Sequence, residues 1–156
     1  MGGELIFYFI EERWPSDIIL ALQQDRISMP AGEMFTMVVA LVAFASVLPG
    51  LRHAVCFTDS MATKSVLTSG ASPAPQLNEL AMWLFSRLPG VQILAIHQPG
   101  VRNDAADGIS RSDLAKVLRE VRQAGWRPER VPVPPGAWEL ARSLLSLPPA
   151  VPDSLL

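Results

Sequence analysis

The sequence feature that most constrains the fold is an apolar run over residues 34–48, which starts directly after Glu33 and ends at a Pro-Gly pair. A membrane-spanning helix needs about 20 apolar residues, and this run has fifteen. We therefore expect a fully buried core helix over about residues 31–48 rather than a membrane span. The amino terminus has neither the basic start nor the cleavage site of a signal peptide. These patterns predict an intracellular protein, cytoplasmic or nuclear, without membrane contact.

Short apolar runs alternate with helical patterns along the rest of the chain, which predicts an α/β domain of three layers, a mixed sheet flanked by helices. With 156 residues, of which 49% are apolar, the chain can bury a sizeable core. A single cysteine, Cys56, lies in an apolar run and excludes a disulfide framework, so we expect an inert core thiol. The expected strands cover residues 5–10, 53–58 and 91–96, and the other expected helices cover residues 17–24, 60–69, 76–88 and 113–124.

The carboxy-terminal part of the chain differs in composition from the rest. Seven of the fourteen prolines lie after residue 127. Proline interrupts helices and strands. We therefore expect a loosely packed or partner-seeking tail with one short helix near residues 138–147.

Three carboxylates lie at places where a charge needs an explanation. Glu33 begins the apolar helix, Asp59 follows a predicted buried strand, and Asp107 follows the next strand and turn. Each has an ordinary alternative: Glu33 can complement the helix dipole, Asp59 can cap a helix, and Asp107 can be a solvated helix residue. If the two strands are neighbours, the three acids can meet at one edge of the sheet. Clustered carboxylates need a cation, and oxygen ligands suit Mg²⁺ or Mn²⁺.

The residues around these acids resemble the ribonuclease H domain of retroelement reverse transcriptases, of the long-terminal-repeat or tyrosine-recombinase type. Residues 57–60 read Phe-Thr-Asp-Ser, and Glu33 matches the helix-borne Glu of that family. The family's closing motif, P-G-x-x-N-x-x-A-D-x-x-S-R, is matched by Pro99, Gly100, Asn103, Ala106, Asp107, Ser110 and Arg111.

This resemblance implies a ribonuclease H-like fold and a metal-dependent endoribonuclease that uses two Mg²⁺ or Mn²⁺ ions. Its substrate would be the RNA strand of an RNA–DNA hybrid, and an adjacent reverse transcriptase domain is an implied partner. Glu33 and Asp59 would bind the metal at the leaving group, and Asp107 the metal that activates water. The expected nucleic-acid contacts are Ser60, Lys64, Asn103 and Arg111.

One acid of the family pattern has no counterpart in this chain. The family's first strand carries an Asp that bridges both metals, whereas residues 5–10 match a later strand. The resemblance thus implies that the first strands precede Met1, that residues 1–111 are a partial ribonuclease H-like domain, and that residues 112–156 are a helix and proline-rich extension. We expect poor hydrolysis or none. The alternative is an inactive remnant that binds nucleic acid or another protein.

Overall fold

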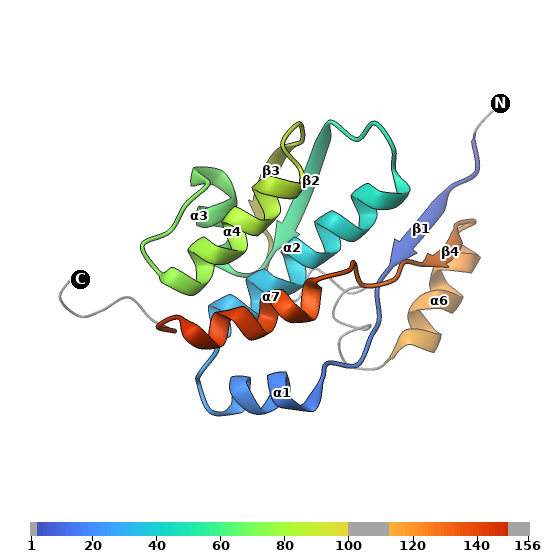
Figure 1. Cartoon of the computed structure of the whole chain (residues 1–156). Helices are drawn as coiled ribbons and strands as arrows, with labels where there is room; N and C mark the ends of the chain where they lie inside the picture. The colour runs from blue at the N-terminus through green and yellow to red at the C-terminus, as the bar shows by residue number, and fades with distance from the viewer. Residues whose placement is uncertain (1–2, 100–112, 150–156) are drawn as a thin grey trace.

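The computed structural model describes residues 3–99 and 113–149 and has a mixed α/β fold (Figure 1). The expected α/β class is therefore confirmed. The elements in chain order are β1 (Ile6–Phe9), α1 (Ser16–Gln23), α2 (Met29–Val47), β2 (His53–Thr58), α3 (Met61–Ser69), α4 (Pro75–Arg87), β3 (Gln92–His97), α6 (Leu114–Gln123), β4 (Arg127–Arg130), α7 (Ala137–Ser143) and the 3₁₀ turn η2 (Leu144–Ser146).

The long apolar helix α2 forms the centre of the structure. Ser28 caps it by accepting a hydrogen bond from the Ala31 backbone N–H, and Pro30 occupies its first turn. The expectation of complete burial is wrong, because Glu33 and Thr36 are exposed and only part of the helix faces the core. By length and composition alone, α2 could cross a membrane. Here its apolar side packs against α4 and α3.

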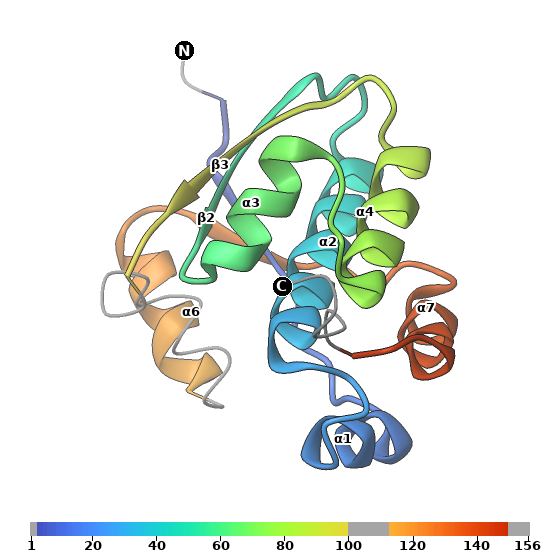
Figure 2. The ribbon, with the colours of Figure 1, turned by 90° about the vertical axis from the view of Figure 1, so that its left-hand side faces the viewer.

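The strands β2 and β3 form a parallel pair that is covered by helix α3 on one face, as Figure 2 shows. Ser60 begins α3, and Gly70 ends it with a φ of 81°, in the left-handed region that glycine adopts readily. The strand before Asp59 was expected to be buried, but only one of its faces is. On the uncovered face Val55, Phe57 and Leu94 are 56%, 48% and 59% exposed.

The strand β1 does not join β2 and β3 but pairs in parallel with β4. The single mixed sheet that we expected is therefore wrong for the described residues, where both strand pairs are parallel and separate. Helix α6 packs against β4 (Figure 1). The sequence of β4, Arg-Pro-Glu-Arg, has none of the apolar character of a strand, and Arg127 instead forms an ion pair with Glu4, 2.7 Å from Nε to Oε1.

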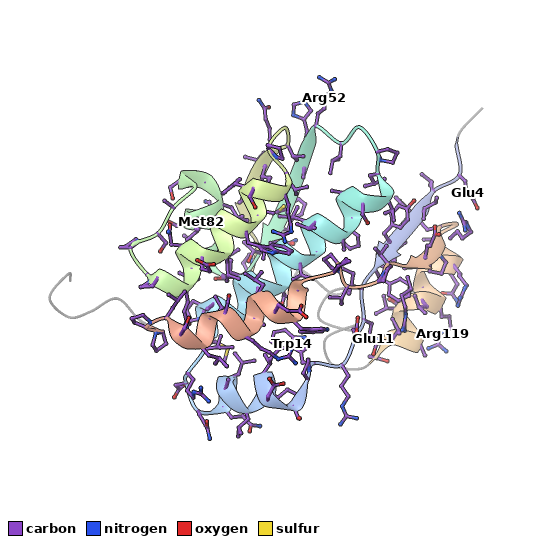
Figure 3. All side chains as sticks on the ribbon, in the orientation of Figure 1. Glu4, Glu11, Trp14, Arg52, Met82 and Arg119 are labelled. Atoms are coloured by element: carbon purple, nitrogen blue, oxygen red, sulfur yellow. The ribbon has the colours of Figure 1, made fainter. Side chains whose placement is uncertain are left out.

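The carboxy-terminal helix α7 belongs to the core. Ala137, Leu140 and Leu144 are each at most 5% exposed. Trp138 packs edge-on against Trp14, with ring centroids 6.2 Å apart, beside the start of α1 (Figure 3). The expectation of a loosely packed tail is therefore wrong for α7 and the turn that follows it.

A buried glutamine on α4 joins the two ends of this core. The side chain of Gln76 is fully buried, and its Oε1 accepts a hydrogen bond from the Ser28 backbone N–H at 3.0 Å. Its Nε2 donates to the backbone carbonyls of Arg26 at 2.7 Å and Leu144 at 3.0 Å. One amide thus hydrogen-bonds to the backbone before α2 and to the backbone after α7. It thereby links the segment at residues 26–28 to Leu144.

We predict that Gln76→Ala strongly destabilises the protein. The change leaves the part-buried Ser28 N–H and Arg26 carbonyl without their protein partner, while the Leu144 carbonyl keeps the hydrogen bond from the Leu147 N–H. Each unsatisfied group costs about 1–3 kcal/mol. Urea unfolding followed by circular dichroism should show a loss of about 3 kcal/mol in the free energy of unfolding.

The matched control is Gln23→Ala, at an exposed position of α1. Its unfolding free energy should stay within about 0.5 kcal/mol of the parent. A loss below about 1 kcal/mol in Gln76→Ala would show that water replaces the amide at low cost.

A second connection between α1 and α7 predicts a pH dependence. The Arg142 Nε donates a hydrogen bond to Asp17 at 2.9 Å, and this bond lowers the pKa of the Asp17 carboxyl below 3.8. A lowered pKa stabilises the fold above the unfolded value and loses that contribution as the pH falls through the folded value. Arg142→Gln should raise the Asp17 pKa toward 3.8 in a carboxyl NMR titration. The variant should have a slightly lower free energy of unfolding than the parent at pH 6, and this difference should shrink below about pH 3.8. An unchanged Asp17 titration in the variant would contradict the pairing of Asp17 with Arg142.

Candidate functional site

The first part of the candidate site is the junction between β2 and α3. The Thr58 hydroxyl accepts a hydrogen bond from the Ser60 N–H, and the Ser60 hydroxyl accepts one from the Thr63 N–H, both at 3.1 Å. Ser60 is therefore the cap of α3, and the alternative explanation of Asp59 as a helix cap is wrong. Asp59 lies exposed between the strand and the helix.

The parallel pairing of β2 with β3 builds the second part. Thr58 is in register with His97, and the Gln98 N–H donates to the Thr58 carbonyl at 2.8 Å. The condition that these two strands are neighbours is thus met. The chain that follows β3 leaves the sheet beside Asp59, at the edge where open α/β structures place their ligands.

Glu33 is carried by α2. It lies in the second turn of that helix and is exposed. The helix dipole acts mainly within the first turn, so it explains Glu33 less well than it would explain an acid nearer Ser28. Helix α2 packs against α3, which begins directly after Asp59. Helix α3 thus contacts both α2, which carries Glu33, and β2, which precedes Asp59.

Glu33 and Asp59 have the carboxylate chemistry of metal ligands, but they are only two of the three acids expected at the metal site. Glu33 and Asp59 offer carboxylate oxygens, the donors that Mg²⁺ and Mn²⁺ prefer, and neither forms an ion pair with another described residue. Residues 3–99 and 113–149 contain no group of three or more His, Cys, Asp or Glu side chains placed to hold a metal. The third acid, Asp107, lies outside the described residues.

Of the four predicted nucleic-acid contacts, two belong to the described residues and two do not. Ser60 is buried and its hydroxyl is engaged as a cap, while Lys64 is half-buried in the first turn of α3. Asn103 and Arg111 lie outside the described residues. His97 is the exposed last residue of β3.

The chain matches no family model, no curated protein and no solved structure. The resemblance to retroelement ribonucleases H therefore rests on the sequence motif of residues 97–111 and on the order of the acids along the chain alone.

Sequence reasoning missed the apolar face of the β2–β3 pair, which lies on the same strands as the site. Residues 53–58 and 92–97 are mostly apolar runs without the alternation that would reveal an exposed face. The opposite face carries Cys56, which is 5% exposed. Burial raises the pKa of its thiol to about 11, in agreement with the expected inert core thiol.

We predict that Cys56 reacts slowly with a thiol reagent in the folded protein. At pH 8 its pKa of about 11, against 9.0 for an exposed thiol, reduces the reactive thiolate about a hundredfold. Absorbance with Ellman's reagent should show a reaction at least about a hundredfold slower than in urea. A fast native reaction would mean that β2 separates from α3 easily.

Proposed function

We propose that this chain is a ribonuclease H-like domain of a retroelement that binds RNA–DNA hybrids inside the cell. The observation that carries this proposal is the parallel pairing of β2 with β3, which brings the start of the closing motif beside Asp59. A motif match alone would not require the two segments to be neighbours. The ribonuclease H-like fold is part of the proposal, as is an adjacent reverse transcriptase domain as partner.

In this function Glu33, Asp59 and Asp107 are the metal-binding acids. Glu33 and Asp59 are exposed and free of ion pairs within the described part of the chain, so no internal cation competes for them. Two Mg²⁺ or Mn²⁺ ions, when bound, would stabilise the charge on the scissile phosphate and lower the pKa of a water. Asp59 and His97, at the ends of the paired strands, are both exposed.

The nucleic-acid contacts of the proposal are Ser60, Lys64, Asn103 and Arg111. Lys64 can offer its ammonium group to phosphate from the start of α3, next to Asp59. The contact of Ser60 would use its backbone, because its hydroxyl caps α3. Such contacts read the backbone and the A-like shape of a hybrid rather than its base sequence.

We predict that Asp59→Asn weakens Mn²⁺ binding by about tenfold, because it removes a charged ligand. Titration of free Mn²⁺ by electron paramagnetic resonance measures this affinity. The matched control is Asp25→Asn, at an exposed turn with a φ of 56° that asparagine also adopts. Equal Mn²⁺ affinities in all three proteins would contradict a metal-binding role for Asp59.

Cleavage of a labelled RNA–DNA hybrid in Mn²⁺ should be weak or absent, because the bridging acid of the family is not found in the sequence. Strong cleavage that disappears in Asp59→Asn would preserve the ribonuclease assignment but contradict the expected loss of activity. Hybrid binding without cleavage in any variant would favour the second candidate, an inactive nucleic-acid-binding module. That candidate is supported by the family's bridging acid, for which this chain has no counterpart.

A further inference from the structure

Helix α6 has two faces of very different character. Val117 is 5% exposed, and the helix packs against β4. Lys116, Arg119 and Arg122 are all exposed. Their spacing of three residues keeps them on one side of the helix, and Figure 3 shows Arg119 projecting from α6. The apolar side of α6 is therefore used within the protein, while a row of positive charges faces outward.

These three bases differ from the bases of the neighbouring strand. Arg127 pairs with Glu4 at 2.7 Å, and Arg130 pairs with Glu11 at 2.8 Å. The three bases of α6 form no ion pair with any described residue. The acidic Glu120 lies on the same helix, also without an ion pair in the described part. The row thus keeps an excess of positive charge that is available to a partner.

An exposed indole follows directly after this row. Gly125, with a φ of 87°, turns the chain at the end of α6, and Trp126 is 41% exposed. The Gly125 N–H donates to the Arg122 carbonyl at 3.0 Å, and the Trp126 N–H donates to the Val121 carbonyl at 3.1 Å. These two bonds hold the indole at the carboxyl end of the helix.

We propose that Lys116, Arg119, Arg122 and Trp126 form a binding surface for a single strand of nucleic acid. Positive charges complement phosphates, and an exposed indole provides a face on which an unpaired base can stack. The row spans about 9 Å along the helix axis at 1.5 Å per residue. That length corresponds to about three nucleotides of a stacked strand at 3.4 Å each. A duplex would not offer an unpaired base to Trp126.

A membrane surface is the less suitable partner for the same helix. A helix that binds in a lipid interface inserts its apolar side into the membrane. In α6 that side is already packed against β4, with Val117 buried. Only the charged side is available, and it suits a polyanion in solution.

This surface goes beyond the proposed function and does not depend on the acids of the candidate site. If the metal-binding experiment at Asp59 fails, the proposed α6 surface is not contradicted, because the two proposals are tested by separate experiments.

The test measures the affinity of the full chain for a fluorescein-labelled 20-nucleotide oligothymidylate by fluorescence anisotropy, without divalent metal. Arg119→Glu combined with Arg122→Glu should weaken binding at least tenfold and flatten the salt dependence by about 0.7 in log–log slope for each lost contact. Trp126→Ala should weaken binding about tenfold. It should also remove quenching of tryptophan fluorescence on binding.

The matched control is Arg26→Glu combined with Arg52→Glu, an equal change in net charge at exposed positions away from α6. Its affinity should change less than threefold, and circular dichroism checks that every variant is folded. Charge-neutral Arg119→Gln combined with Arg122→Gln gives a second measurement if the reversed charges prevent folding. Equal losses in the α6 and control variants would overturn the proposal. So would wild-type binding to phosphatidylserine vesicles but not to the oligonucleotide.

Discussion

The side chain of Gln76 is the interaction on which the rest of the structure depends. Its amide hydrogen-bonds to Arg26 and Ser28 before α2 and to Leu144 after α7, all at 2.7–3.0 Å. A buried amide with unmatched partners would cost free energy, whereas a fully bonded one selects a single arrangement of the groups around it. These bonds hold the segment that leads into α2, the helix that carries Glu33.

The parallel pairing of β2 with β3 has two consequences for function. It brings Thr58 and His97 into register, so that the chain after β3 leaves beside Asp59. It also exposes apolar side chains such as Phe57 on the face that α3 does not cover. Parallel strands are usually covered on both faces. The strand pair that forms the candidate site therefore also presents an uncovered apolar face among the described residues, while the positive charge of α6 is carried on a separate element.

Local sequence patterns predicted most of the helices and strands but not how they associate. The apolar stripe of α4 and Gly70 after α3 placed those helices within one or two residues, because side-chain period and backbone freedom act locally. The strand β4 was missed, since its backbone pairs with β1 although its side chains are polar. The position of α7 in the core was also missed. Its prolines indicated a loose tail, but Ala137 and Leu144 are buried against residues far away in the chain.

The sequence by itself determined the α/β class, the order of the acids and the motif that resembles the closing motif of ribonucleases H. Those properties are linear and need no knowledge of distant contacts. Only the tertiary structure decided that β2 and β3 are neighbours, that Ser60 rather than Asp59 caps α3, and that the sheet is divided into two pairs. Strand pairing and burial depend on backbone groups and surfaces from separated segments, and no single stretch of sequence encodes which partner each will meet.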